Sequence, residues 1–434
     1  MAKKKRRNPD HVRRRNRPSD NNEEIERRLQ ELLTPAVWAQ MGYYRQLKMR
    51  SRILTLPLMV ALVLTILWRQ VPSVNELTRM LSRENLLWCT AVKVTQQALS
   101  ERFLVFPAEL FERVYKDLLP HLEERWEQRQ QRPLPLSIRI ASEQFDQILV
   151  ADGSTLEALF RKLKSLEEVP LGQLAGKMCM VIDLVRQLPV ELWFSEEARA
   201  FDTNFIPDLL ALVGEKSLLI LDRGFYDFQF FADLMTNGAH FITRLKSNTK
   251  IEVVHRLSYT DSVKDMVVRL VGTGQNGAPI LTVRVIEVRF GKQWYRYMTS
   301  VLDPELLPPF VVADLYRRRW RIEDAFNTAK RLLNLSYLWT GSVNGIQLQI
   351  WATWLFYAVL VDLGDAVADE MNLPFDRISL EMLYRGLYHF IQAFSKGKAS
   401  DPVAYFAAPE NQDLGVVKRI RKRIPRLNIA PYPI

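Results

Sequence analysis

The sequence predicts an α/β protein in which a mixed or largely parallel sheet is flanked by helices, preceded by a helical segment. Up to Arg132 the apolar residues follow a helical pattern without strand alternation. Beyond it, short apolar runs alternate with helical stretches, which is typical of a sheet covered by helices. The predicted strands are Gln147 to Ala151, Met178 to Val185, Val190 to Phe194, Ser217 to Leu221 and Ala239 to Leu245. The polar segment Glu127 to Pro135 separates the two patterns and predicts a domain boundary.

The helical segment contains clear helix starts. Ser73 and Glu76 have the spacing of a capping box, and Thr95 can cap a helix that runs to Phe103. With a further predicted helix at Arg83 to Val94 they form a small helical unit. Its side chains available to DNA phosphates are Arg79, Arg83, Lys93 and Arg102. This unit is either a helix-turn-helix or an ordinary helical packing module. The absence of a short turn with Gly favours the packing module.

The segment from Asn248 to Leu302 is rich in strands and predicts a β-rich insertion, with Gly291-Lys292 as a two-residue hairpin turn. A long helix follows from near Val311, and the apolar helix Ile350 to Leu363 is expected to pack on the sheet. The expected organisation is a basic disordered tail at 1–30, a helical N-terminal domain at 31–132, the α/β domain at 140–365 with its insertion at 248–302, and a helical and basic region at 366–434.

The charge pattern predicts a polyanionic partner. The formal net charge is +11, and nine Lys or Arg fall between Lys3 and Arg17. Such a block binds a polyanion such as nucleic acid or serves as a solvated tail. Cys89 and Cys179 are the two cysteines of the sequence, which excludes a disulfide framework and indicates a reducing cytoplasm. The run Ile53 to Trp68 is short for a membrane span and predicts a buried helix, so no membrane association is expected.

Two aspartates end predicted strands. Asp152 follows Ile148-Leu-Val-Ala and precedes Gly153, and Asp222 follows Leu218-Leu-Ile-Leu. Side chains at strand ends face the edge at which α/β folds place their sites, and a nearby Gly leaves room for a ligand. Each aspartate alone is equally compatible with a turn or a helix cap.

The predicted helix from Val311 to Leu333 carries a row of polar side chains. Tyr316, Arg319, Glu323 and Lys330 have offsets of 0, 3, 7 and 14, which place them within about 60° of one another at about 100° per residue. The row is either a phosphate-binding and metal-binding face or a solvated face of exposed ion pairs.

Three carboxylates, in a chain with two Cys and five His, favour oxygen-ligated Mg²⁺, with Mn²⁺ as a substitute, over zinc. Two such ions activate a water or a 3′ hydroxyl and stabilise the leaving oxygen in an in-line attack on phosphorus. The residues therefore predict metal-dependent phosphodiester chemistry on a nucleic acid.

At these positions the sequence resembles the DDE transposases of bacterial insertion sequences, in the branch with the signature Tyr-x2-Arg-x3-Glu-x6-Lys. Tyr316, Arg319, Glu323 and Lys330 match that signature without a gap. Val150 to Thr155 resembles the first-aspartate segment, Leu221 to Tyr226 the second, and Gly238 to Lys246 the text that follows it. The resemblance covers roughly Gln144 to Val361.

The resemblance implies a ribonuclease-H-like fold with a β-rich insertion and two divalent ions held by Asp152, Asp222 and Glu323. It further implies that Tyr316, Arg319 and Lys330 contact DNA phosphates at the transposon end. This branch also resembles enzymes that cut through a DNA hairpin and hold a flipped base with an inserted tryptophan. Trp294, near the hairpin turn, is the candidate for that role or a packed structural residue.

The resemblance thus implies cleavage of double-stranded DNA that carries terminal repeats and transfer of the cut strands to a target DNA. The expected enzyme is a homodimer in the bacterial cytoplasm that associates with the nucleoid when bound to DNA. A catalytically silent or domesticated DNA-binding protein and a standalone metal-dependent nuclease are the alternatives. The silent alternative would be favoured by the loss of a carboxylate, and none is lost here.

Overall fold

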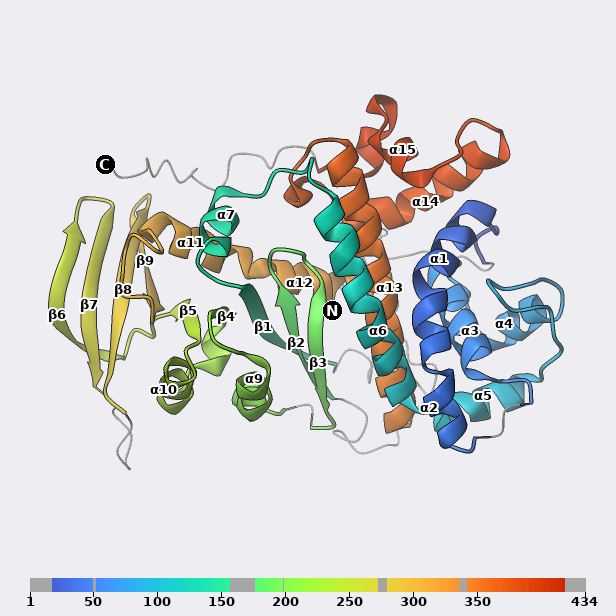
Figure 1. Cartoon of the computed structure of the whole chain (residues 1–434), viewed down its shortest axis with the longest axis horizontal. Helices are drawn as coiled ribbons and strands as arrows, with labels where there is room; N and C mark the ends of the chain where they lie inside the picture. Colours follow the sequence, from blue (N-terminus) through green and yellow to red (C-terminus); the bar gives the residue numbers. More distant parts are fainter. Residues whose placement is uncertain are drawn as a thin grey trace, which may run out of the picture. The chain divides into compact units, whose positions relative to one another are not determined.

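The computed structural model describes residues 18–49, 52–156, 176–197, 199–271, 279–333, 335 and 342–417 (Figure 1). The basic tail from Lys3 to Arg17 and the basic cluster from Lys418 to Arg426 lie outside these residues. The chain divides into two compact units. Unit 1 comprises Met1–Arg129, Ala329–Glu370 and Ile378–Val416, and unit 2 comprises Gln130–Thr328, Met371–Arg377 and Val417–Ile434.

Unit 2 is built on one nine-stranded mixed sheet of order β3-β2-β1-β4-β5-β9-β8-β7-β6. Its strands are β1 (Gln147–Thr155), β2 (Lys177–Asp183), β3 (Pro189–Ser195), β4 (Ser217–Leu221), β5 (His240–Arg244), β6 (Lys250–Tyr259), β7 (Val263–Val271), β8 (Leu281–Phe290) and β9 (Gln293–Thr299). β1 pairs in parallel with β4 and β4 with β5, whereas β2 runs antiparallel to β1. This mixed sheet confirms the predicted α/β class and is consistent with a ribonuclease-H-like fold.

Helices cover both faces of this sheet (Figure 1). One face packs on α9 (Ile206–Leu212) and α10 (Phe228–Thr236), through a core that includes Ala151, Leu221 and Phe231. The other face contacts α7 (Leu136–Ser142), α11 (Pro309–Arg318) and α12 (Trp320–Asn327). The central strands β1 and β4 are buried along most of their length because they are covered on both faces, which explains their continuous apolar runs. The short helices η2 (Asp202–Phe205) and η3 (Arg223–Phe225) complete the connections around β4.

The strand-rich segment extends the sheet. β9 pairs with β5 in antiparallel fashion, and β8, β7 and β6 add to it in turn. The predicted hairpin turn joins β8 and β9, and Gly291 has the positive φ of 61° that a side chain would disfavour. The insertion therefore shares a continuous sheet with the rest of unit 2.

The helix that carries the polar row is interrupted. α11 ends at Arg318, α12 begins at Trp320, and a π-helical turn, η4, spans Thr328–Leu332. At the junction the amide of Arg319 bonds to the Tyr316 carbonyl, and the Ile322 amide bonds to the Arg319 carbonyl, three residues back in each case. The prediction of one continuous helix from Val311 to Leu333 was wrong, so the angular spacing derived for it does not extend to Lys330.

Unit 1 is helical. Its helices are α1 (Glu23–Ala39), α2 (Met41–Gln46), α3 (Leu56–Trp68), α4 (Val74–Leu81), α5 (Gln96–Val105), α6 (Ala108–Gln128), α13 (Val343–Glu370), α14 (Leu380–Ser395), α15 (Pro402–Ala407) and η6 (Pro409–Leu414), while η5 (Phe375–Arg377) belongs to unit 2. Every residue of α3 is buried, as the sequence predicted, and Pro57 lies in its first turn.

The apolar helix predicted at Ile350 to Leu363 lies in the helical unit. This segment belongs to α13, which packs mainly on α6, α15, α3, α5 and α14 within unit 1. Residues 329–365 therefore group with the helical unit, whereas the sequence assigned them to the α/β domain. In the described part of the chain, α13 is the one helix long and apolar enough to cross a membrane, and most of it is buried against protein, as in a core helix.

The small N-terminal helical unit also differs from its prediction. The Ser73 and Thr95 caps are confirmed, since their side chains accept the amides of Glu76 and Ala98. The segment Arg83–Val94 is not helical, so no short turn joins α4 to α5 as a helix-turn-helix requires. The Arg102 guanidinium donates to the Tyr44 hydroxyl and the Leu54 carbonyl and is not free for DNA phosphates.

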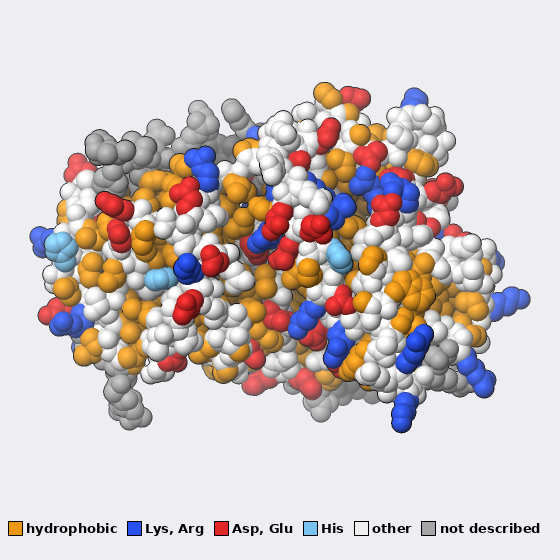
Figure 2. Space-filling model, in the orientation of Figure 1, with side chains coloured by type: hydrophobic (Ala, Val, Ile, Leu, Met, Phe, Trp, Pro, Cys, Tyr) orange, Lys and Arg blue, Asp and Glu red, His pale blue; other side chains and the backbone are white. Residues whose placement is uncertain are grey.

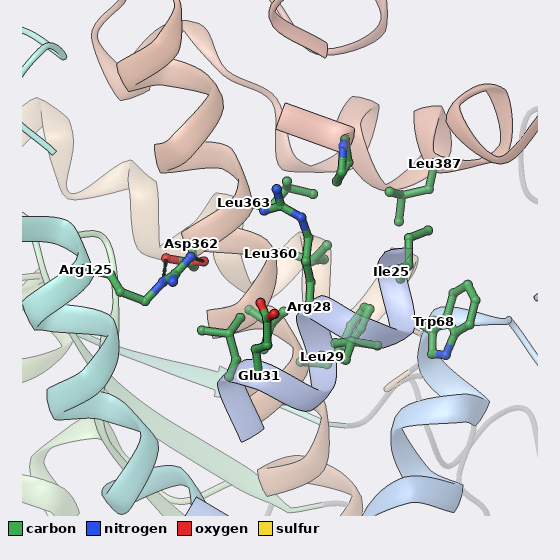
Figure 3. Close-up of a pocket in the computed structure, with 14 residues that line it drawn as sticks. Ile25, Arg28, Leu29, Glu31, Trp68, Arg125, Leu360, Asp362, Leu363 and Leu387 are labelled. Atoms are coloured by element: carbon green, nitrogen blue, oxygen red, sulfur yellow. Dashed lines mark hydrogen bonds and ion pairs between the residues drawn. The ribbon is translucent and has the colours of Figure 1, made fainter. Parts of the chain in front are cut away.

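The helices of unit 1 enclose an apolar pocket (Figure 3). Its lining residues include Leu29, Trp68, Leu360 and Leu387, from α1, α3, α13 and α14. At one side the Arg125 guanidinium donates to both carboxylate oxygens of Asp362, at 3.0 and 3.1 Å (Figure 3). The pocket belongs to unit 1, whereas the acidic residues predicted from the sequence belong to unit 2.

Candidate active site

Two predicted carboxylates lie on neighbouring strands: Asp152 within β1, which continues to Thr155, and Asp222 directly after β4. In the parallel ladder between β1 and β4, Ala151 pairs with Leu221, so Asp152 and Asp222 are the next residue on each strand. Adjacent strands lie about 4.8 Å apart, which brings these two residues side by side. Ala151 and Leu221 face the core under α9 and α10. Because side chains alternate along a strand, Asp152 points to the face that carries α11 and α12.

Arg319 joins these aspartates to the helix. Its guanidinium donates to an oxygen of Asp152 at 2.7 Å and to an oxygen of Glu323 at 3.0 Å. The same guanidinium lies 3.6 Å from an oxygen of Asp222. One cation therefore lies among the three carboxylates that the sequence singled out, at the junction of α11 and α12.

The three carboxylates differ in exposure. The side chain of Asp152 is 13% exposed, whereas those of Asp222 and Glu323 are 39% and 34% exposed. Burial raises the pKa of Asp152 from 3.8 to about 7; the charge of Arg319 opposes this shift, while those of Asp222 and Asp202 add to it. The site thus has a buried floor at Asp152 and an open side at Asp222 and Glu323.

Tyr316 connects the site to the inserted strands. Its hydroxyl donates to Asp222 at 3.3 Å, and its ring packs 5.4 Å from the ring of Tyr297 on β9. Burial, together with the charge of Asp222, raises the pKa of Tyr316 to about 12, so the phenol remains a hydrogen-bond donor. Arg244, at the end of β5, interacts electrostatically with both tyrosines and lies over the ring of Tyr295.

The neighbouring arginines of the same helices behave differently. Arg317 and Arg318 pair with Asp314, and Arg318 and Arg321 pair with Asp376. These are ion pairs of the kind that the interpretation of the row as a solvated helix face predicted. Arg319 and Tyr316 differ from them, because their side chains contact Asp152 and Asp222. The polar row therefore contains both kinds of residue, which sequence spacing alone could not separate.

Lys330 and Trp294 are not brought into this cluster by the described contacts. Lys330 lies on the π-helical turn in unit 1, and burial lowers its pKa. Trp294 pairs with Arg289 near the hairpin turn, and the Lys264 ammonium lies 4.8 Å from its ring centre. Trp294 is three residues from Tyr297 along β9, so it lies roughly 10 Å along the strand and on the opposite face. The roles predicted for these two residues stay predictions.

The structure adds an acidic residue that the sequence interpretation missed. Asp202, at the start of η2, lies against the backbone of both Gly153 and Gly224 and pairs with Lys177 at 2.6 Å. No spacing links Asp202 to the other aspartates in the sequence. The glycines beside Asp152 and Asp222 were the available signal, because a glycine often marks a close approach.

Comparison with known proteins identifies a family for half of the chain. The family described as Transposase DDE domain matches residues 143–359, half of the chain. The chain belongs to the DDE transposase family.

Curated relatives of this transposase carry matching names. "Putative transposase y4zB" of Sinorhizobium fredii is 28% identical over 148 residues, 32% of this chain and 41% of the relative. "Putative transposase for insertion sequence element IS4SA" of Synechocystis is 27% identical over 164 residues, 37% of this chain and 45% of the relative. "Probable transposase for insertion sequence element IS5377" of Geobacillus stearothermophilus is 26% identical over 172 residues, 39% of this chain and 45% of the relative. Each match spans less than half of the relative's length.

The DDE transposase family uses divalent metal ions, and the acidic residues fit such ions in kind. All three side chains offer carboxylate oxygens, the ligands that Mg²⁺ and Mn²⁺ prefer. Among the described residues, no three His, Cys, Asp or Glu side chains converge as a ready-made metal site. At Asp152, Asp222 and Glu323 the guanidinium of Arg319 lies between the oxygens. The cluster accepts a cation, and Arg319 must move aside for a metal ion.

Proposed function

We propose that this transposase cleaves DNA strands at the ends of an insertion sequence and transfers them to a target DNA, in a reaction that requires divalent metal ions. The observation that supports this most is the convergence of Asp152, Asp222 and Glu323 around one guanidinium. The three carboxylates carry more negative charge than Arg319 neutralises. Such an excess at a solvent-open edge favours divalent cations.

In this proposal Asp152, Asp222 and Glu323 hold two Mg²⁺ ions, which Mn²⁺ can replace. Bound there, the metal ions would activate the attacking oxygen and stabilise the leaving oxygen at phosphorus. Asp152 anchors the site from its buried position, and the more open Asp222 and Glu323 face the DNA.

Arg319 has the second role. Displaced from the carboxylates, its planar guanidinium can bind two oxygens of a DNA phosphate while it remains next to Glu323 on the same helix. Tyr316 donates a hydrogen bond beside it, and we assign both to the phosphates at the transposon end. Lys330 as a further phosphate contact and Trp294 as the base-stacking residue complete the proposal.

The charge distribution supports DNA as the partner. Residues 1–17 and 418–434 together hold fifteen Lys or Arg and one Asp, which leaves 45 Lys or Arg against 48 Asp or Glu elsewhere. On the visible face of Figure 2, acidic and basic side chains are mixed. The positive excess therefore resides at the two ends of the sequence, where it would attract DNA in a salt-dependent manner. We infer action in the bacterial cytoplasm, by a homodimer that joins two transposon ends.

One assay tests the function. The purified chain is incubated with Mg²⁺ and DNA that carries the terminal repeats flanking its gene, and the products are examined for cleaved and joined strands. Joined products that require both the repeats and Mg²⁺ support the proposal. Cleavage of unrelated DNA without joining indicates a nuclease, and binding of the repeats without cleavage indicates a DNA-binding protein without chemistry.

A further inference from the structure

The side chain of Asp202 fills the space between the two segments that follow Asp152 and Asp222. A Cβ atom on Gly153 would lie 1.9 Å from one carboxylate oxygen of Asp202, and a Cβ atom on Gly224 would lie 2.1 Å from the other. Both distances are far below a van der Waals contact, so a side chain at either position would have to displace the Asp202 carboxylate. Gly153 directly follows Asp152, and Gly224 comes two residues after Asp222. One carboxylate thus touches both aspartate-bearing segments.

Lys177 fixes this carboxylate in place. Its ammonium lies 2.6 Å from an oxygen of Asp202 and donates to the Ala200 carbonyl at 2.7 Å. Lys177 opens β2, where it pairs with Thr155 at the end of β1. The Lys177 and Asp202 side chains are 11% and 19% exposed, so the pair is shielded from solvent over most of its surface. The position of Asp202 is therefore tied to the sheet.

Asp222 needs such support more than Asp152 does. Asp152 lies within β1 and pairs with Met180 on β2. The ladder of β4 with β1 ends at Leu221, and Asp222 lies between this strand and the short helix η3, with its side chain 39% exposed. The contact between Asp202 and Gly224 limits how far η3 can move away from β1.

We propose that Asp202 is a positioning residue: held by Lys177, it wedges between Gly153 and Gly224 and sets the distance between the carboxylates of Asp152 and Asp222. This inference rests on the proposed metal-dependent cleavage by those residues. Asp202 acts through backbone packing, because its two oxygens face the glycines and Lys177. Supporting residues of this kind typically change metal affinity by about 10- to 100-fold when they are replaced.

The first test uses Lys177→Met in the full chain, with Mn²⁺ binding followed by electron paramagnetic resonance. Electrostatics alone predicts tighter binding, because a cation near the site is removed. The positioning role predicts the opposite, Mn²⁺ binding weakened by about tenfold. Asp202→Asn, which keeps the side-chain size but breaks the ion pair, is expected to weaken binding as well. Unchanged or tighter binding in Lys177→Met would overturn the proposal.

Arg186→Met is the matched control for this test. Arg186, in the turn after β2, pairs with Asp183 at 2.8 Å at the other end of that strand, so its replacement removes a partly buried cation that lies next to the same strand. We expect Mn²⁺ binding to stay at the wild-type level. Weakening equal to that of Lys177→Met would indicate a general loss of sheet integrity and overturn the specific role. Circular dichroism establishes that each variant is folded.

The second test uses the glycine that the wedge contacts. Gly224→Ala is expected to displace the Asp202 carboxylate and weaken Mn²⁺ binding, whereas Gly214→Ala is not, because a Cβ atom at Gly214 meets nothing within 4 Å. The double variant Asp202→Ala with Gly224→Ala removes the clashing oxygen and leaves Cβ at 3.3 Å. It should bind Mn²⁺ no more weakly than Asp202→Ala alone. Additive losses would contradict the shared contact.

The two proposals fail in different ways. If the wild type binds Mn²⁺, loses it in Asp222→Asn and is indifferent to Lys177→Met, the positioning role is wrong and the cleavage centre stands. If the wild type neither binds Mn²⁺ nor cleaves transposon ends, the proposed function fails, and the positioning role fails with it.

Discussion

Arg284 and Arg319 are both buried arginines of unit 2, and both face aspartates, but the charges around them differ. Arg284 on β8 forms two hydrogen bonds with Asp265 on β7, at 2.8 and 2.6 Å, and the two side chains are 0% and 1% exposed. Its remaining donors reach the carbonyls of Asp303 and Leu307, which precede α11. One cation is therefore paired with one anion, and backbone carbonyls accept the remaining hydrogen bonds of Arg284.

Arg319 has no such balance. It contacts three carboxylates, two of which are more than one-third exposed, and the group has a surplus of negative charge. Burial lowers the pKa of Arg319, but the charges of Asp152 and Asp222 outweigh burial and raise it overall. A balanced, enclosed pair holds the fold together, whereas an acid-rich, open cluster is suited to exchange its cation. Charge balance thus distinguishes the arginine of the enclosed pair from the arginine that we propose to be functional.

The largest expected effect is on catalysis. Asp152→Ala, Asp222→Ala and Glu323→Ala should each abolish end cleavage, a loss of at least about a thousandfold if the metal ions contribute several kcal/mol. Folding and binding to the transposon end should persist, because the metal site is removed and the core is not. End cleavage in a gel assay measures this. Asp208→Ala, an exposed aspartate on α9 under the other face, is the control. Retained cleavage in one variant would remove that residue from the site.

The next effect separates Arg319 from its helical neighbours. Arg319→Ala should reduce end cleavage and joining by at least about tenfold, because the phosphate clamp is lost, and Arg319→Lys should restore little of it. Mn²⁺ binding should become tighter, since a competing cation has been removed. Lys330→Ala should likewise reduce cleavage. Near-wild-type cleavage in both alanine variants would contradict the phosphate-binding role. It would indicate that these residues form only exposed ion pairs, which contribute about 0 to 1 kcal/mol to stability.

A smaller, structural effect is expected at Arg284. Arg284→Met leaves Asp265 buried without its partner and should lower the free energy of unfolding by about 3 to 5 kcal/mol. Arg319→Met should cost less than half of that, because two of its three carboxylates, Asp222 and Glu323, reach solvent. Urea unfolding of both variants provides the comparison. Equal losses would mean that charge balance does not distinguish the two arginines.

The smallest effect is a pH dependence of stability. Since the pKa of Asp152 is raised from 3.8 to about 7, the folded chain holds a proton that the unfolded chain has released in this range. The contribution of Asp152 is therefore favourable at low pH and is lost as the pH rises from about 4 to 7. In buffer with EDTA, the urea midpoint of the wild type should fall more steeply across this range than that of Asp152→Asn. Parallel curves would contradict the raised pKa.

Local pattern was enough to predict the positions of Asp152 and Asp222. A buried strand reads as a short apolar run, and both runs end at these aspartates. β4 ends with its run at Leu221, but β1 continues past Asp152 to Thr155, so the predicted end of that strand was wrong. The helix row led correctly to Tyr316 and Arg319 as neighbours of the acidic residues. That Arg319 lies among the carboxylates depends on how α12 packs on β1, which no local spacing encodes.

The sequence failed where long-range packing decides. Lys330 falls on a π-helical turn, so a regular period of 3.6 residues does not apply to it. Arg102 was expected to be free, but tertiary contacts with Tyr44 and Leu54 occupy it. Asp202 is brought to the site by the connection between β3 and α9, at 50 residues from Asp152 and 20 from Asp222, with no motif to mark it.

The central claim is that the acid-rich cluster, and not the balanced pair, exchanges its cation for divalent metal. Replacing Mg²⁺ by Fe²⁺ and adding ascorbate and peroxide generates hydroxyl radicals that cut the backbone next to the bound iron. Mapping of the fragments should place the cuts near Asp152, Asp222 and Glu323, and excess Mg²⁺ or Asp222→Asn should suppress them. Cuts near Asp265 and Arg284, or cuts that persist in excess Mg²⁺ and in Asp222→Asn, would contradict the claim.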